Sequence, residues 1–272
     1  GFEMFSLLLS LFKDITTFGD KAGFVDNMLE EVVRILNGSR ASIFLINPET
    51  NELEAISAMG INKQKLKFDY HFLDTDYGVV SLDIIKKHID SDSVLLINSM
   101  PGYFAVQDNM KEIHELCKDK GCLLINDVAG SIGTEQAKYG DIIIGSFVRW
   151  KPLNLEYGGF ISFNDKEYSK FFTEKFDKEL KEFYPELLTQ LNGLEKRREK
   201  FLVVSKKIKT QLSQYDVIHK SHQGYNVIIK YSSPKEKLDI LNYCKLYNYE
   251  FTLCPRYIRV MDDAISIEVK RL

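Results

Sequence analysis

The chain has 272 residues, of which 44% are hydrophobic and 12% aromatic, enough for one large domain with a small appendage. Its formal net charge of −3 argues against nucleic acid or an anionic membrane surface as the main partner. Four cysteines without metal-ligand spacing are typical of a reduced, cytoplasmic protein. The apolar residues 5–12 are too few to span a bilayer, so no membrane partner is expected either.

Short apolar runs alternate with segments of helical periodicity between residues 41 and 163. The runs lack polar alternation, which is typical of strands buried on both faces. Alternating strands and helices predict an α/β fold, with a mostly parallel central sheet covered by helices on both faces. A helix at 22–36 precedes this block. The predicted strands are 41–46, 67–73, 93–98, 122–126, 142–147 and 160–163, and the predicted helices are 52–60, 81–89, 108–120 and 134–139.

After the predicted sheet, residues 165–215 are rich in Lys and Glu, with apolar residues at helical spacing. This pattern predicts two helices, with a break near Tyr184-Pro185. We therefore expect a large domain at 1–170, followed at 171–272 by connecting helices and a small C-terminal α+β subdomain. In that subdomain we expect strands at 225–231, 250–254, 257–260 and 265–269 and a helix at 234–247.

An acid and a lysine lie at the ends of two neighbouring predicted strands, where open parallel sheets bind their ligands. Asp127 ends one strand, and Lys151 follows the next. Pyridoxal 5′-phosphate (PLP) chemistry needs a Schiff-base lysine and a carboxylate that keeps the pyridine nitrogen protonated. The Ser146 hydroxyl, with nearby backbone N–H groups, suits the phosphate. Each residue alone is more often structural, since a strand-end Asp usually caps a turn and a loop Lys is usually solvated.

The segment Ser146-Phe-Val-Arg-Trp-Lys151-Pro-Leu-Asn-Leu-Glu-Tyr-Gly158-Gly159 resembles the cofactor-lysine motif of the DegT/StrS family of sugar aminotransferases. Asp127-Val-Ala129 resembles the Asp-Ala-Ala of that family, and residues 188–198 resemble its helix with Gln-Leu and a basic pair. The resemblance covers residues 67–200. It implies a fold-type-I PLP enzyme and a homodimer, with Lys151 as Schiff-base lysine, Asp127 as pyridinium partner, Ala129 beside the cofactor and Ser146 as phosphate ligand.

Several positions depart from the family pattern. Gly130 stands where the family has a cofactor-contacting Gln. The phosphate-binding turn would fall at Gly19 and Asp20, where Gly19 keeps the turn but Asp20 places a carboxylate near a dianion. The aromatic residue that stacks on the cofactor ring is missing from 47–52, so Trp150 or Phe104 would have to replace it.

These observations leave two functions open. The first is PLP-dependent transfer of an amino group from a donor to a keto group, with a nucleotide-linked sugar as the acceptor. The second is a catalytically degenerate PLP fold with a binding or regulatory role, which the missing Gln and aromatic residue favour.

The N-terminal region has an alternative interpretation. Residues 38–55 resemble the opening helix and hairpin of a GAF sensory domain, with Pro48-Glu-Thr-Asn51 as the hairpin turn. A helix at 52–60 would favour the PLP fold here, whereas a strand would favour the GAF-like hairpin.

Overall fold

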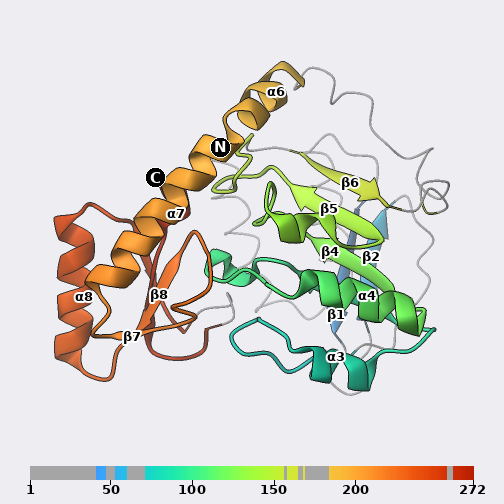
Figure 1. Ribbon diagram of the computed structural model, residues 1–272, viewed down its shortest axis with the longest axis horizontal. Coiled ribbons are helices and arrows are strands. Elements are labelled where there is room, and N and C mark those ends of the chain that lie inside the picture. The colour runs from blue at the N-terminus through green and yellow to red at the C-terminus, as the bar shows by residue number, and fades with distance from the viewer. Residues whose placement is uncertain are drawn as a thin grey trace, which may run out of the picture. The chain divides into compact units, whose positions relative to one another are not determined.

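The structure is a computed structural model that describes residues 41–46, 53–59, 71–155, 158–164, 168, 184–255 and 260–272 (Figure 1). The chain divides into two compact units, Gly1–Phe72 and Leu73–Leu272, and each is described by itself. The predicted domain boundary between residues 170 and 171 falls outside the described residues, as does the predicted helix at 22–36. None of the described helices is long and apolar enough to cross a membrane.

The described part of the first unit is an antiparallel hairpin. Strand β1 (Ala41–Ile46) pairs with β2 (Leu53–Met59), with a register irregularity between Ile43 and Phe44. The predicted helix at 52–60 is therefore wrong, because the backbone groups of this segment pair with β1 instead of within one helix. A hairpin at this position is what the GAF-like interpretation predicted.

The second unit contains a four-stranded sheet in the order β3-β4-β5-β6. β3, β4 and β5 are parallel, and β6 is antiparallel to β5. The predicted α/β fold with a mostly parallel sheet is confirmed. Residues 71–73 at the end of the predicted strand 67–73 are not in a strand, and residues 67–70 are outside the described part. The strands are β3 (Val94–Asn98), β4 (Leu123–Asp127), β5 (Ile142–Ser146) and β6 (Gly159–Phe163).

Helices α3 (Leu82–His88) and α4 (Met110–Lys120) pack on one face of this sheet (Figure 1). Gly121 ends α4 in the left-handed conformation that favours glycine, with φ of 72°. The predicted helix at 134–139 is only the 3-10 turn η2 (Glu135–Lys138), because Gly133 and Gly140, both at positive φ, confine it. The core under α3 and α4 contains Ile85, Leu95, Ile97, Ile113 and Leu124.

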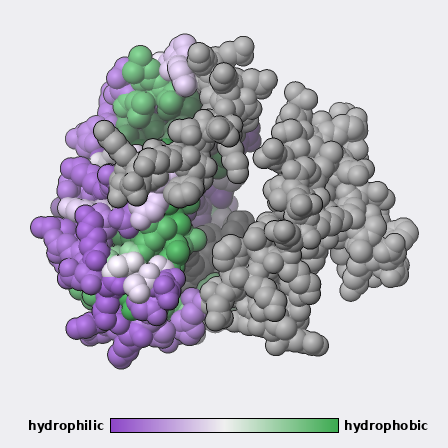
Figure 2. Space-filling model, turned by 90° about the vertical axis from the view of Figure 1, so that its right-hand side faces the viewer, coloured by the Kyte–Doolittle hydropathy of each residue, from purple (hydrophilic) through white to green (hydrophobic). Residues whose placement is uncertain are grey.

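The opposite face of the sheet carries exposed apolar side chains. Val94 and Leu96 are 59% and 65% exposed, and strand alternation puts them on the same face as Asn98. Figure 2 shows one side of the molecule, where described apolar residues, in green, lie among hydrophilic ones, in purple. Asp127 pairs with Asn98, so it lies on this second face of the sheet.

The C-terminal part forms an antiparallel sheet in the order β7-β8-β10-β9, with helices packed against it. The predicted small α+β subdomain is thus present, although most of the predicted strand 257–260 lies outside the described residues. The predicted break near Tyr184-Pro185 is where α6 begins, and nearly all of the helix predicted before it lies outside the described residues. The second predicted helix is interrupted at Gly193, which separates α6 from α7. The elements are α6 (Tyr184–Asn192), α7 (Leu194–Gln211), β7 (Asp216–Val217), β8 (Val227–Lys230), α8 (Pro234–Leu246), β9 (Phe251–Leu253), β10 (Ala264–Ile267) and η4 (Val269–Arg271).

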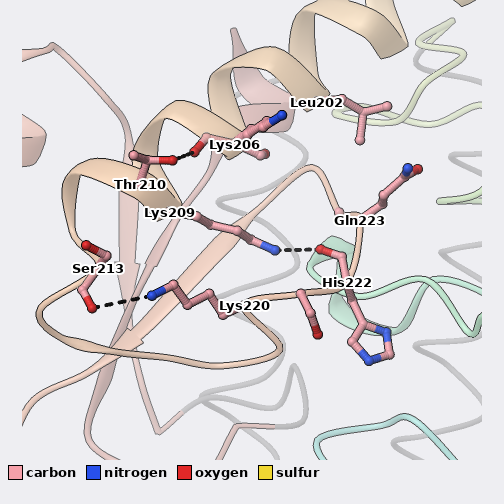
Figure 3. Close-up of a pocket in the computed structure, with 11 residues that line it drawn as sticks. Leu202, Lys206, Lys209, Thr210, Ser213, Lys220, His222 and Gln223 are labelled. Carbon is pink, nitrogen blue, oxygen red and sulfur yellow. Dashed lines mark hydrogen bonds between the residues drawn. The ribbon is translucent and has the colours of Figure 1, made fainter.

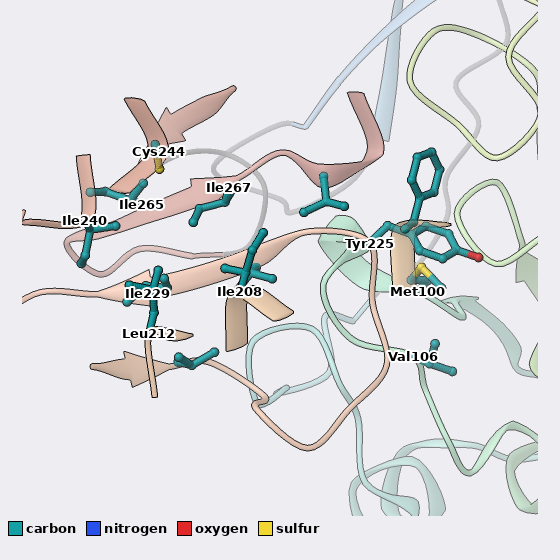
Figure 4. Packing of buried hydrophobic residues seen from close by; sticks show 14 residues of the cluster. Met100, Val106, Ile208, Leu212, Tyr225, Ile229, Ile240, Cys244, Ile265 and Ile267 are labelled. Carbon is teal, nitrogen blue, oxygen red and sulfur yellow. The ribbon is translucent and has the colours of Figure 1, made fainter. Parts of the chain in front are cut away.

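The core of this subdomain joins α7, α8 and the sheet, and it also receives residues from the loop after β3 (Figure 4). Met100 and Val106 pack into it, and both are 2% exposed. Phe104 packs on the other side of the sheet, against Ile228 and Ala264. The loop between β3 and α4, which includes η1 (Pro101–Tyr103), therefore fixes this subdomain to the edge of the parallel sheet.

Gly224 allows a close approach between this loop and the subdomain. A methyl group at Gly224 would overlap the backbone carbonyl of Phe104, and backbone atoms cannot rotate away as side chains do. We expect Gly224→Ala to lower the free energy of unfolding by about 1–3 kcal/mol, measured by urea denaturation. Gly193→Ala is the matched control, because its nearest neighbour would lie 3.6 Å away in helical backbone. Equal losses in the two variants would contradict this account.

Candidate active site

The carboxylate of Asp127 is held in place at the carboxyl end of β4. Its Oδ2 accepts a hydrogen bond of 3.0 Å from Asn98 Nδ2, and its Oδ1 accepts one of 3.0 Å from the Ala129 backbone N–H. Each carboxylate oxygen has two acceptor positions, so both oxygens keep room for a further donor. Asp127 is therefore oriented and still able to bind a protonated ring nitrogen.

Ser146 ends the neighbouring strand on the same face. Asp127 pairs with Ile144, and Ser146 follows two residues later, so the strand alternation puts it on the side of Asp127. The chain then turns back, with hydrogen bonds from the Phe147 N–H to Gly158 O and from the Leu155 N–H to Phe147 O. The loop closed in this way carries the lysine of the motif.

Lys151 is half-buried and has no hydrogen bond or ion pair with the described residues. Burial lowers the pKa of its ammonium group, while the nearby Asp127 carboxylate raises it in part. A lowered pKa leaves more of the amine unprotonated, which is the form that attacks a carbonyl. A half-buried amine without a partner thus fits attachment of an aldehyde cofactor.

The Tyr103 ring lies beside Gly130, the position at which the family resemblance implies a Gln. A methyl group at Gly130 would lie 3.1 Å from the Tyr103 ring, so the ring fills the space that glycine leaves. Tyr103 has a positive φ of 65°, and its carbonyl accepts hydrogen bonds from the N–H groups of Tyr225 and Asn226. Burial raises the pKa of Tyr103 to about 12, and the Asp127 carboxylate adds to this. The phenol therefore stays protonated beside Asp127 at neutral pH.

The C-terminal turn η4 brings two cations to the same place. Lys270 Nζ lies 3.6 Å from the centroid of the Tyr103 ring, and the Arg271 guanidinium carbon lies 4.3 Å from the centroid of the Trp150 ring. Burial lowers the pKa of Lys270 to about 8, and the positive charges of Arg271 and Lys151 lower it as well. Sequence reasoning assigned no role to Tyr103, Lys270 or Arg271.

The carboxylate of Glu268, directly before η4, fixes the position of this turn. It is 2% exposed, and its Oε2 accepts a hydrogen bond of 3.0 Å from Asn226 Nδ2. Its Oε1 accepts hydrogen bonds from Thr252 Oγ1 at 2.9 Å and Ser266 Oγ at 3.0 Å, and Lys270 Nζ lies 3.6 Å from Oε2. One buried carboxylate thus joins β9, β10 and the residue before β8, and it also lies beside a cation of the candidate site.

Removing this carboxylate should strongly destabilise the protein. We expect Glu268→Ala to lower the free energy of unfolding by about 3–5 kcal/mol, because Lys270 would keep a buried charge without a partner. Glu250→Ala serves as the control, since that carboxylate is 61% exposed in its ion pair with Arg271. The control should lose no more than about 1 kcal/mol in urea denaturation. A loss in Glu268→Ala as small as in the control would refute the assignment.

The predicted site residues that the structure describes come together. Asp127, Ala129, Ser146 and Lys151 all lie at the carboxyl ends of β4 and β5 or just beyond them. The predicted phosphate turn at Gly19 and Asp20 lies outside the described residues. The described groups fit PLP, because a fixed carboxylate and an unpartnered, half-buried amine adjoin the same sheet edge.

Of the two aromatic residues considered for stacking, Phe104 does not fit. It is 1% exposed and stacks on His219 with a centroid distance of 5.8 Å, so it belongs to the core. Trp150 is 46% exposed, but its ring contacts the Arg271 guanidinium. The Tyr103 ring is another aromatic group at the site, near enough to Asp127 for that carboxylate to raise its pKa.

Several solved structures share this fold. The chain is similar to DndA from Streptomyces lividans, with a TM-score of 0.53 and 9% identity over 71% of this chain and 65% of the other. It is also similar to a GDP-4-keto-6-deoxymannose-3-dehydratase with bound GDP-perosamine, with a TM-score of 0.51 and 12% identity over 72% of this chain and 69% of the other. At these identities, the likeness concerns the fold alone. No curated protein sequence matches the chain.

Two family models match the sequence. The model of the MJ1341 family C-terminal domain matches residues 195–272, which include α7 and the antiparallel sheet. The model of the DegT/DnrJ/EryC1/StrS aminotransferase family matches residues 68–219, which include the parallel sheet, Asp127 and Lys151. Because this second match spans more than half of the sequence, the chain belongs to the DegT/DnrJ/EryC1/StrS aminotransferase family.

Proposed function

We propose that this protein is an aminotransferase that transfers an amino group to a keto group on a nucleotide-linked sugar, with Lys151 as the lysine that holds the cofactor. PLP is the cofactor of the family to which the chain belongs. The single observation that carries the proposal is the arrangement of Lys151 and Asp127. A half-buried, unpartnered amine adjoins an oriented carboxylate at the carboxyl ends of neighbouring strands.

The side chains of Asp127, Lys151 and Ser146 have roles in cofactor binding and in proton transfer. When bound, PLP supplies an electron sink for the carbon that loses its proton. Asp127, held by Asn98 and the Ala129 N–H, keeps a proton on the ring nitrogen. Lys151 would hold the cofactor, and its Nζ would carry a proton to and from the substrate. The Ser146 hydroxyl donates to the phosphate.

The charge around the site supports an anionic substrate. Lys270 and Arg271 reach the Lys151 loop from the C-terminal turn, and burial keeps both largely out of water. Cations held in this way favour a ligand with phosphate or carboxylate groups. A nucleotide-linked sugar carries a diphosphate, as does the GDP-perosamine bound to one structural neighbour. The homodimer and the cytoplasmic location remain part of the proposal.

A specific observation favours the second candidate, a PLP-fold protein without transfer activity. The Tyr103 ring occupies the space next to Gly130, so a phenol lies beside the position at which the family resemblance implies a Gln. If the phenol does not substitute for that contact, the fold binds cofactor or ligand without turnover.

The half-reaction separates the two candidates. We expect PLP-loaded protein to convert its cofactor to pyridoxamine phosphate on addition of glutamate or glutamine, as followed by absorbance. A nucleotide-linked keto sugar should then restore the original spectrum. Bound PLP that no amino donor converts would contradict the aminotransferase and support the binding role.

A further inference from the structure

A second site lies in the C-terminal subdomain, away from the residues assigned above. A cavity of about 540 Å³ opens between α7 and residues 220–224 (Figure 3). Cavities of this size hold small-molecule ligands. All of the lining residues fall within the segment matched by the C-terminal domain model, 195–272, and none belongs to the aminotransferase motif at 146–159.

One side of α7 supplies most of the lining. Lys209 follows Ser205 by four residues and Lys206 by three, so its side chain shares a face of the helix with each of them. Lys220 and the backbone of the following residues close the other side (Figure 3). The lining contains three lysines and no carboxylate.

Lys209 is a buried cation without an acidic partner. Its side chain is nearly enclosed, with 8% of the residue exposed. Its Nζ donates a hydrogen bond of 2.7 Å to the carbonyl oxygen of His222 (Figure 3) and one of 3.2 Å to that of His219. An ammonium group has three N–H donors, so one is left. Since Lys209 forms no ion pair with any described carboxylate, its charge is uncompensated, and burial lowers its pKa to about 8.

The Ser205 hydroxyl is a second buried polar group at the cavity whose hydrogen-bonding capacity is not used. It is 3% exposed, and its Oγ has no hydrogen-bond partner in the part of the chain that the structure describes. A serine in a helix can bond to the carbonyl four residues earlier, but this hydroxyl does not. A buried hydroxyl that lines a cavity and has no protein partner is available to bind a ligand oxygen.

The remaining charges also favour an anion. Lys206 and Lys220 are exposed at the rim, and Lys220 Nζ has a single long contact of 3.5 Å, to Ser213 O. The cavity lies near the C-terminal end of α7. The helix dipole places roughly half a negative elementary charge at that end, which disfavours an anion. The positive charges of the three lining lysines together exceed this partial charge of the helix dipole. Asp108 Oδ2 lies 3.2 Å from Nδ1 of the lining residue His222, but Asp108 is not itself a lining residue.

We propose that this cavity binds a small anion of the phosphate class, such as a phosphate monoester or a diphosphate. The buried Lys209 ammonium and the Ser205 hydroxyl bind its oxygens, and Lys206 and Lys220 neutralise the outer charge. The C-terminal subdomain thereby has a ligand of its own, separate from the substrate and cofactor at Lys151.

Titration of inorganic pyrophosphate into PLP-saturated full-length protein, followed by calorimetry, tests the proposal. We expect one saturable site whose affinity falls at least about tenfold in the double variant Lys206→Gln/Lys220→Gln. Both replaced side chains are exposed, so the fold should be retained. Lys200→Gln is the control, because it removes one positive charge from an exposed position of α7 outside the cavity and should bind as the wild type does.

Ser205→Ala provides a second test that does not alter charge. It removes a hydroxyl without a protein partner, so the stability should be unchanged while the affinity for pyrophosphate falls severalfold. Absence of saturable binding at millimolar pyrophosphate would overturn the proposal. Equal affinity in the double variant and in Lys200→Gln would also overturn it, as would equally tight binding of citrate, which would reveal a general anion patch.

Discussion

Lys151→Ala should lower the rate of amino transfer by about a thousandfold or more, because it removes both cofactor attachment and a proton carrier. Lys151 makes no hydrogen bond or ion pair with the described residues, so its loss should leave the free energy of unfolding nearly unchanged. Single-turnover absorbance with glutamate measures the first effect, and urea denaturation measures the second.

Two further variants control for charge. Lys151→Arg keeps a positive charge beside Asp127 but cannot attach an aldehyde, so it should be as inactive as the alanine variant. Lys138→Ala removes an exposed lysine that pairs with Glu135, and it should be fully active. Activity retained in Lys151→Arg would mean that only charge is needed at this position, contrary to the assignment.

Asp127→Asn should reduce amino transfer by about 10²- to 10⁴-fold, because a neutral amide cannot keep the pyridine nitrogen protonated. The amide keeps the shape of the side chain and its contact with the Ala129 N–H, although it loses the hydrogen bond from Asn98, because two amide NH2 groups then face each other. The pKa of Lys151 should fall further, since Asp127 is the charge that raises it. A titration of PLP attachment against pH measures this shift.

The control for this variant is Asp119→Asn, which removes a charge from an exposed position of α4. It should leave both the turnover and the pH profile unchanged. If Asp127→Asn kept full turnover, Asp127 would be only a turn residue at the end of β4, which is the more usual role of an Asp at that position.

The central sheet was predictable because its strands are short apolar runs with turns at both ends. Leu95, Ile97 and Leu124 lie under α3 and α4, while the alternate positions face the other side, so both sets of positions are apolar. The candidate lysine was predictable for a different reason, since the motif from Ser146 to Gly159 is contiguous. The fold places its start on β5 and its end on β6.

The hairpin was not predictable from local propensity. Leu53, Ile56 and Met59 have a spacing that suits a helix, yet the segment pairs with β1. Strand pairing depends on a partner seven or more residues away, and helical propensity is too weak to oppose it. The competing interpretation, which considered both segments together, predicted the strand.

Tyr103, Lys270 and Arg271 could not be assigned from the sequence, because nothing local links residue 103 to residue 270. Their contacts arise only when the subdomain packs on the loop after β3. The one local signal was the turn Pro101-Gly102-Tyr103 directly after a strand, with Gly102 and Tyr103 both at positive φ. Such backbone strain is often found at functional sites.

Reduction of the PLP-loaded protein with borohydride, followed by peptide mass spectrometry, tests the central claim most directly. We predict a single pyridoxyl adduct, located on Lys151. Lys209 and Lys270, whose pKa values burial lowers to about 8, are the described lysines most able to compete with it. An adduct on either of these lysines, or no adduct at all, would contradict the assignment of Lys151 as the cofactor lysine.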